Sequence, residues 1–308
     1  MSVEGTELEK SRTWLFDQDQ NHRLLVKMTA ELHGFPELLS IPRSFDELVR
    51  LGYDSRILDM VLYTLLHMKP VIITQIGDGY QWIGARTEQR DLHAFEMQRR
   101  WLRLEEVLMS GKPAGTLEPW FLDILTDTMR LSSLELMPSV VDFVKRHTSP
   151  HATGIDIGGS HGLFSKNMMI HGYDMTVLDL PFVVQKASKH SPELNFIGHN
   201  ILEEPLTAFD QAYDFALMIR FVHMHGPIDI ATIIENARPA MAPHAKWIVI
   251  DTVRGISPNA DVFAINMGVN TPHGNTYSVA DMERFSGLRC THQELLPALG
   301  YAGLIFEN

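Results

Sequence analysis

The fold of this chain is decided by the stretch Gly154-Ile155-Asp156-Ile157-Gly158-Gly159-Ser160-His161-Gly162. An apolar segment with the character of a β-strand runs into glycines, and a helical pattern follows. A second apolar segment, Met175-Thr176-Val177-Leu178-Asp179, ends in an acid. Glycines allow a tight turn and bring backbone N–H groups close to a ligand. A carboxylate at the tip of the next strand can bind both hydroxyls of a ribose. The two segments predict a nucleoside-binding crevice and favour an enzyme over a binding module.

The spacing of the two segments sharpens this prediction. Asp179 follows Gly158 by 21 residues, close to the roughly 20 expected for a ribose-binding acid. A glycine-rich turn alone would also suit NAD, FAD or another nucleotide. Asp156 lies inside the first strand, where it could instead be a hydrogen-bonded support for the loop.

The bulk properties describe an ordinary globular protein of 308 residues, enough for one large domain or two modest ones. A formal net charge of −12 argues against a nucleic-acid partner, because such binding needs clustered Lys and Arg. Cys290 is the single cysteine, which excludes an internal disulfide and suits a reducing cytoplasm. No basic and apolar leader and no long apolar run are present, so we expect a cytoplasmic protein without a membrane partner.

The first half of the chain has helical periodicity. Helices are expected at 22–39 and 55–68, a capping box joins Ser44 to Glu47, and an Asp-Gly turn at 76–79 connects two short strands. These two helices, a third that starts at the capping box between them, and the hairpin that follows are typical of a winged-helix module. Two further helical segments are expected at 92–109 and 117–147.

From Thr153 onward, strands and helices alternate, which predicts an α/β fold with a mostly parallel sheet covered on both faces. The last two strands are joined by a short link, so they must pair antiparallel. The seven expected strands are 154–158, 175–179, 194–198, 214–220, 246–252, 289–295 and 303–307, and the intervening helices are 162–171, 182–190, 230–241 and 279–285.

The glycine loop, followed by Leu178-Asp179-Leu180-Pro181, resembles S-adenosylmethionine-dependent small-molecule O-methyltransferases of the plant caffeate and bacterial antibiotic-tailoring type. That family has an Asp-x-Gly-Gly-Gly-x-Gly loop, and Ser160 stands here in place of the third glycine. The likeness continues in order through Ile219-Arg220-Phe221-Val222-His223 and Ile248-Val249-Ile250-Asp251.

This resemblance implies a Rossmann-like class I methyltransferase domain at 150–308 with a seven-stranded, mostly parallel sheet. A mainly α, winged-helix dimerisation domain at 1–149 would precede it and build a homodimer. S-Adenosyl-L-methionine would be the cofactor, and an aromatic or polyketide-like small molecule the substrate. The residues expected at the cofactor are Asp156, Gly158, Gly159, Gly162, Asp179, Leu180, Asn200, Ile201 and Arg220.

His223 is the expected general base, because a neutral hydroxyl must lose its proton as it takes the methyl group and histidine titrates near pH 6.5. Asp251 would hold the imidazole in one tautomer and stabilise the imidazolium. The residues expected to line the substrate pocket are His225, Phe263, Asn266, Met267, Asn270 and His273.

Two departures from the family pattern keep other reactions open. Thr276 stands where a second carboxylate is usual, and His225 and His273 are additional histidines near the expected base. No metal is the main expectation, yet His223, His225 and His273 could form a metal site for C-methylation, and N-methylation is also open.

A ligand-sensing transcription regulator is the competing class, because it also uses a winged helix. The candidate recognition helix at 55–68 carries Arg56 as its one Lys or Arg, beside the acids Asp54 and Asp59, so it would repel phosphates.

Overall fold

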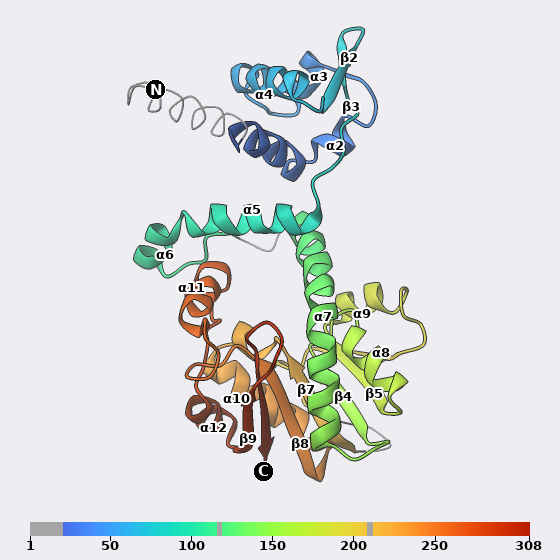
Figure 1. Cartoon of the computed structure of the whole chain (residues 1–308), viewed down its shortest axis with the longest axis vertical. Coiled ribbons are helices and arrows are strands. Elements are labelled where there is room, and N and C mark those ends of the chain that lie inside the picture. The colour runs from blue at the N-terminus through green and yellow to red at the C-terminus, as the bar shows by residue number, and fades with distance from the viewer. Residues whose placement is uncertain (1–20, 116–118, 208–211) are drawn as a thin grey trace, which may run out of the picture. The chain divides into compact units, whose positions relative to one another are not determined.

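The computed structural model describes residues 21–115, 119–207 and 212–308 (Figure 1). The chain divides into two compact units. The first holds the described residues up to Met97 together with the start of helix α7 (Pro119–His147) as far as Leu125, and the second holds the described remainder from Gln98 onward. No helix among the described residues combines the length and the apolar character that crossing a bilayer requires.

The first unit is mainly helical with a small antiparallel sheet in the order β1-β3-β2. Its core gathers fully buried leucines from several helices, among them Leu39, Leu48 and Leu62. The chain is helical at 21–32, and the further elements are α2 (Phe35–Leu38), β1 (Arg43–Ser44), α3 (Phe45–Arg50), α4 (Ser55–His67), β2 (Ile73–Ile76), β3 (Gly79–Trp82) and α5 (Gln89–Trp101), whose last residues belong to the second unit.

Local sequence signals account for most of these boundaries. Ser44 and Glu47 form the predicted capping box, with the Ser44 N–H donating to Glu47 Oε2 at 2.8 Å. The predicted hairpin is confirmed by the pairing of Ile73 with Trp82. The helix expected over 22–39 is interrupted, because Gly34 adopts a left-handed conformation (φ 74°) and Pro36 begins a separate short helix.

The second unit contains a seven-stranded sheet in the order β6-β5-β4-β7-β8-β10-β9. The first five strands in this order are parallel. β10 pairs antiparallel with β9, as the short final link predicts, and it also pairs antiparallel with β8. The strands are β4 (Thr153–Ile157), β5 (Asp174–Asp179), β6 (Asn195–Gly198), β7 (Tyr213–Ile219), β8 (Met241–Asp251), β9 (Arg289–Leu295) and β10 (Ala302–Glu307).

Helices connect these strands where the alternating pattern predicts them. The helical segment expected at 92–109 is divided into α5 and α6, and residues 117 and 118 of the next expected helix lie outside the described residues. The helices are α6 (Leu104–Ser110), α7 (Pro119–His147), α8 (Leu163–Ile170), α9 (Pro181–Ala187), α10 (Pro227–Ala237), α11 (Ala260–Asn270) and α12 (Val279–Ser286), with 3₁₀ turns at Val222–Met224 and Arg238–Ala240.

Both faces of the sheet are buried, which explains why its central strands are almost entirely apolar. Along β7, Phe215 and Leu217 pack with α7 and α8, whereas Ala216 and Met218 pack with α10 and α12 on the opposite face (Figure 1). This is the predicted α/β arrangement with helices on both faces. The predicted domain boundary at 149/150 and the winged-helix assignment stay predictions; α7 from residue 126 onward belongs to the second unit.

Gly154 provides a test of how tightly the sheet packs. A Cβ at this position would lie 2.3 Å from Phe215 Cζ and 2.8 Å from Met175 Sδ. We therefore expect Gly154→Ala to lower the free energy of unfolding by about 1–3 kcal/mol through overpacking. Gly268→Ala in α11 is the matched control, because nothing lies within 4 Å of the added carbon, and it should raise stability by about 0.5–1 kcal/mol. Equal denaturant midpoints for the two variants would contradict this packing.

Candidate functional site

The carboxyl ends of four parallel strands meet at one edge of the sheet. Strands β4, β5, β7 and β8 end at Ile157, Asp179, Ile219 and Asp251, and they are neighbours in the order β5-β4-β7-β8. Side chains at these ends and in the loops that follow them are therefore placed together. Ligands of open α/β sheets bind outside this edge.

The glycine loop after β4 is held against the neighbouring strand by its own backbone. The N–H groups of Gly158 and Gly159 both donate to Leu178 O, at 2.8 and 3.4 Å. Gly158 has φ 73°, and a Cβ there would lie 2.2 Å from Phe221 Cδ2. Ser160 has φ 50°, so the residue that replaces the family's third glycine keeps a left-handed backbone.

Asp156 lies beneath this loop and is 1% exposed. Its Oδ2 accepts a hydrogen bond from Ser165 Oγ at 2.8 Å, and a Cβ on Gly159 would lie 2.7 Å from its Cγ. Burial raises the pKa of the Asp156 carboxyl to about 7. The sequence leaves two roles open for Asp156, contact with the cofactor and support of the glycine loop, and these contacts favour support.

Asp179 closes the loop from the tip of β5. Its Oδ2 accepts from the Ser160 N–H at 2.8 Å, and its Oδ1 accepts from the Leu180 N–H at 2.7 Å. Burial raises the pKa of this carboxyl, and the two backbone donors act against that rise. A carboxylate has about four acceptor positions, so Asp179 can still bind hydroxyl donors of a ligand.

Asn200 and Ile201, two further residues expected at the cofactor, differ in how accessible their side chains are. Asn200 Oδ1 accepts from the Leu202 N–H at 3.2 Å in a turn after β6. The Ile201 side chain is buried in the core, and Ile201 O accepts from Asn236 Nδ2 at 2.8 Å. A ligand at this edge could therefore approach the half-buried Asn200 side chain but not the Ile201 side chain. Gly162, the last glycine of the loop, has φ 70° and is the N-cap residue of α8.

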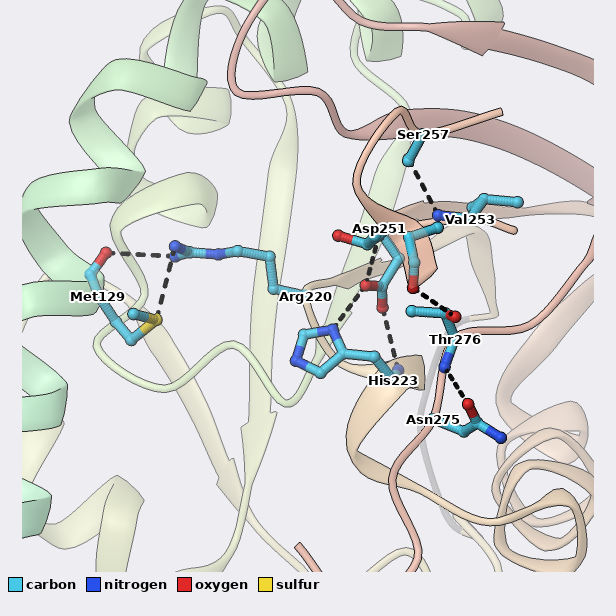
Figure 2. A network of polar contacts seen from close by, with 10 residues as sticks. Met129, Arg220, His223, Asp251, Val253, Ser257, Asn275 and Thr276 are labelled. Carbon is cyan, nitrogen blue, oxygen red and sulfur yellow. Dashed lines mark hydrogen bonds and ion pairs between the residues drawn. The ribbon is translucent and has the colours of Figure 1, made fainter. Parts of the chain in front are cut away.

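His223 and Asp251 form a buried pair (Figure 2). His223 Nδ1 lies 2.5 Å from Asp251 Oδ1, and the His223 N–H donates to Asp251 Oδ2 at 3.1 Å. The Thr252 N–H also donates to Oδ1, at 2.7 Å, and Asp251 is 1% exposed. With Nδ1 engaged by the carboxylate, the neutral ring carries its lone pair on Nε2 and can accept a proton there.

Arg220 connects the end of β7 to α7. Its Nη1 donates to Ser132 Oγ at 2.6 Å, and its Nη2 contacts Ser133 Oγ. Nη2 also donates to Met129 O at 3.2 Å (Figure 2). The Arg220 backbone is left-handed, with φ 53°. Such a conformation costs of order 1–3 kcal/mol outside glycine and concentrates at functional sites.

The expected substrate residues on α11 divide into two groups. Phe263 stands edge-on to the His223 ring, with centroids 5.0 Å apart at 86°. Asn266 and Asn270 are tied to the end of α5, because Trp101 Nε1 donates to Asn266 Oδ1 at 2.9 Å and Arg100 Nη1 donates to Asn270 Oδ1 at 3.4 Å. The remaining member, Met267, is buried.

The two additional histidines do not join His223 in a ligand cluster. His225 packs on Phe221, with ring centroids 4.5 Å apart, and burial lowers the pKa of its imidazole. His273 is exposed. Among the described residues, the His, Cys, Asp and Glu groups whose ligand atoms come within 4.8 Å of one another do not include these histidines. The metal alternative therefore lacks geometric support at this edge.

Several residues of the site were not predicted from the sequence. Ser165 supports Asp156, Ser132 and Ser133 hold Arg220, and Trp101 holds Asn266. Serines on helices are common, so the sequence carried no signal for these contacts. His161 is also new: its Nδ1 accepts from the Leu163 N–H at 3.1 Å, and burial lowers the pKa of its imidazole to about 4.

Comparison with known proteins identifies the family. The family described as the O-methyltransferase domain matches residues 118–285, more than half of the chain. Methyltransferase phm5 of Pyrenochaetopsis sp is 30% identical over 155 residues, which cover 45% of this chain and 41% of that protein. Demethylspheroidene O-methyltransferase of Rhodobacter capsulatus is 23% identical over 103 residues, 33% of this chain and 25% of that protein. The chain thus aligns with less than half the length of either curated relative.

Solved structures share the fold over almost the whole chain. The mitomycin 7-O-methyltransferase MmcR superposes with a TM-score of 0.63 at 18% identity and covers 99% of both chains. Human N-acetylserotonin methyltransferase, solved in complex with SAM, has a TM-score of 0.60 at 16% identity over 96% of this chain and 97% of that one. RosA of Streptomyces davawensis, an N,N-8-amino-8-demethyl-D-riboflavin dimethyltransferase, has a TM-score of 0.59 at 17% identity over 97% and 99%. The predicted class I methyltransferase fold is confirmed.

The raised pKa of Asp156 gives a prediction for stability against pH. The pKa of about 7 in the folded protein lies above the ordinary aspartate value of 3.8, so the unfolded chain loses this proton first as pH rises. This group's contribution to stability is therefore complete below about pH 4 and is lost as pH rises toward 7. In the Asp156→Asn variant this side chain is neutral at every pH. The free energy of unfolding of the variant, relative to that of the original chain, should therefore increase by up to about 4 kcal/mol between pH 4 and pH 8.

Denaturant unfolding at these two pH values measures the Asp156 effect. Asp174→Asn, which alters an exposed acid at the other end of β5, is the control and should show no such gain. Parallel pH profiles for Asp156→Asn and the original chain would show that Asp156 is ionised in the folded protein without penalty.

Proposed function

We propose, because the chain belongs to the O-methyltransferase family, that it transfers the methyl group of S-adenosylmethionine to an oxygen of a small organic metabolite. One observation carries the proposal: a glycine loop closed by Asp179 and a buried His223–Asp251 pair lie at the same edge of one sheet. The first arrangement suits an adenosyl ligand, and the second suits removal of a proton.

The residues around the glycine loop fit the cofactor. The Asp179 carboxylate would accept the two ribose hydroxyls, and the turn at Asn200 would lie beside the adenine. A side chain at Gly158 has no room beside Phe221, and the bare backbone of the loop would let its N–H groups approach the cofactor. The human neighbour solved with SAM supports this choice of cofactor. When bound, S-adenosylmethionine supplies an electrophilic methyl group on a sulfonium.

His223 would act as the general base. Asp251 accepts the Nδ1–H, so Nε2 can take the proton of the acceptor hydroxyl as the new O–CH₃ bond forms. The same carboxylate would stabilise the imidazolium after proton transfer. Phe263 forms an apolar wall beside this base, which supports an aromatic or polyketide-like substrate.

The loss of the family's second carboxylate favours one alternative reaction. Thr276 is 1% exposed, and its Oγ1 donates to Ala260 O at 3.0 Å, so it anchors the start of α11 instead of facing the base. His223 therefore has one orienting acid. An amine acceptor attacks with its own lone pair and depends less on a base. RosA, which shares this fold, is an N,N-8-amino-8-demethyl-D-riboflavin dimethyltransferase. N-Methylation is our second candidate.

A second copy of this chain is the proposed protein partner. Along α4, three apolar side chains spaced three residues apart are exposed: Ile57 (45%), Met60 (52%) and Tyr63 (63%). This apolar face supports dimerisation through the N-terminal unit and does not suit contact with phosphates.

Replacing the base tests the proposed mechanism. His223→Ala should lower kcat by roughly a hundredfold or more and leave the Kd for S-adenosylhomocysteine nearly unchanged. His244→Ala, which alters an exposed histidine on β8, is the matched control and should keep the original rate. An unchanged kcat in His223→Ala, measured with an acceptor that the original chain methylates, would show that His223 is not the general base.

Replacing the ribose-binding acid tests cofactor binding separately. Asp179→Ala should weaken the Kd for S-adenosylhomocysteine by at least about tenfold, because hydrogen bonds to a charged group contribute roughly 1.5–3 kcal/mol. Asp174→Ala removes an exposed acid from the opposite end of the same strand and should leave the Kd unchanged. Equal titration curves for the two variants would contradict the assigned role of Asp179.

A further inference from the structure

The second unit contains a group of metal-ligating side chains outside the proposed active site. His147 is the last residue of α7, and His292 and Glu294 lie on β9. One ligand atom from each comes within 4.8 Å of the other two, and the described residues contain no other such group of three. His292 Nε2 lies 3.2 Å from Glu294 Oε2. His147 Nε2 is buried and makes no hydrogen bond.

A β-bulge directs this part of β9 toward α7. The pairing of β9 with β10 shifts between Ile305 and Phe306, so that Phe306 opposes Cys290 and Ile305 opposes His292. Cys290 packs with the core on the α10 face, whereas Ile305 belongs to the core on the α7 face. Bulges re-aim side chains and concentrate near functional sites.

The spacing of the group matches a tetrahedral metal. Two ligands at about 2.0–2.1 Å from Zn²⁺ are separated by roughly 3.3 Å at a tetrahedral angle. The His292–Glu294 separation of 3.2 Å already has this value. His147, whose ring centroid lies 4.4 Å from that of His292, would have to approach by up to about 1.5 Å for its nitrogen to reach the same spacing.

The charges around the group balance. Arg146 pairs with Glu294 through both guanidinium nitrogens and with Asp142 at 3.0 Å, and Lys246 Nζ donates to His147 O at 2.7 Å. Two cations are therefore offset by two carboxylates before a metal binds.

We propose that His147, His292 and Glu294 bind one divalent transition-metal ion, with Zn²⁺ the best match to two imidazoles and a carboxylate. One oxygen of Glu294 would bind the metal while the other keeps its contact with Arg146. Water would complete the tetrahedron. Since β9 is an edge strand of the sheet, the metal would fasten it to the end of α7.

Titration calorimetry of ZnCl₂ into the full, tag-free chain after chelator treatment tests this site. We expect one Zn²⁺ per chain with a Kd in the micromolar range or below, and no comparable heat from MgCl₂. His147→Gln and His292→Gln should each weaken the Kd at least about tenfold, by analogy with the loss of a ligand or its support. His244→Gln, outside the group, should bind as the original chain does.

Thermal unfolding provides a second readout that does not depend on activity. At a Zn²⁺ concentration about a hundredfold above the Kd, the original chain and His244→Gln should gain roughly 5 °C in Tm, and His292→Gln should gain almost nothing. Unchanged Zn²⁺ affinity in both His147→Gln and His292→Gln would overturn the proposal. A Mg²⁺ response equal to that of Zn²⁺ would overturn it as well.

Discussion

The parallel register of four neighbouring strands is the constraint on which the rest of this structure depends. Asp156 of β4 pairs with Val177 of β5 and with Leu217 of β7, and Ile219 of β7 pairs with Ile250 of β8. The four strands therefore end at the same edge within a few residues of one another. This register brings the loop that follows β4 into contact with Asp179, the acid that ends β5.

Three acids at this edge, of which Asp156 and Asp251 are buried and Asp179 is half-buried, have different environments that suit different roles. Asp156 has one hydroxyl donor and a pKa raised to about 7, which suits a support beneath the loop. Asp179 has two backbone donors and remaining acceptor positions, which suit a ligand. Asp251 has the backbone and ring of His223 together with the Thr252 N–H, which suits orientation of a base. A buried carboxylate is stable only with such hydrogen-bond donors. Because the glycine loop and the 3₁₀ turn supply donors to these acids, the same hydrogen bonds hold both segments in place.

Sequence patterns predicted the sheet well and the contacts of the site only in part. Strands such as β7 were predictable because burial on both faces demands continuous apolar residues. The capping box at Ser44 was predictable because both of its partners lie within one turn. By contrast, the contacts that hold two expected site residues were not predictable. The Arg220 guanidinium binds Ser132 and Ser133, which lie 88 and 87 residues away in the sequence. Asn266 accepts from Trp101, 165 residues away. Such contacts are set by tertiary packing, which no local pattern records.

The central claim is that this edge of the sheet binds an adenosyl sulfonium between the glycine loop and Asp179. Calorimetric titration of S-adenosylhomocysteine into the purified chain tests it most directly, since this product binds without turnover and needs no knowledge of the acceptor. We predict that S-adenosylhomocysteine binds to one site per chain and that S-adenosylmethionine competes with it for this site. Absence of binding heat at millimolar ligand, from a chain whose folded state is verified by cooperative unfolding, would contradict the account.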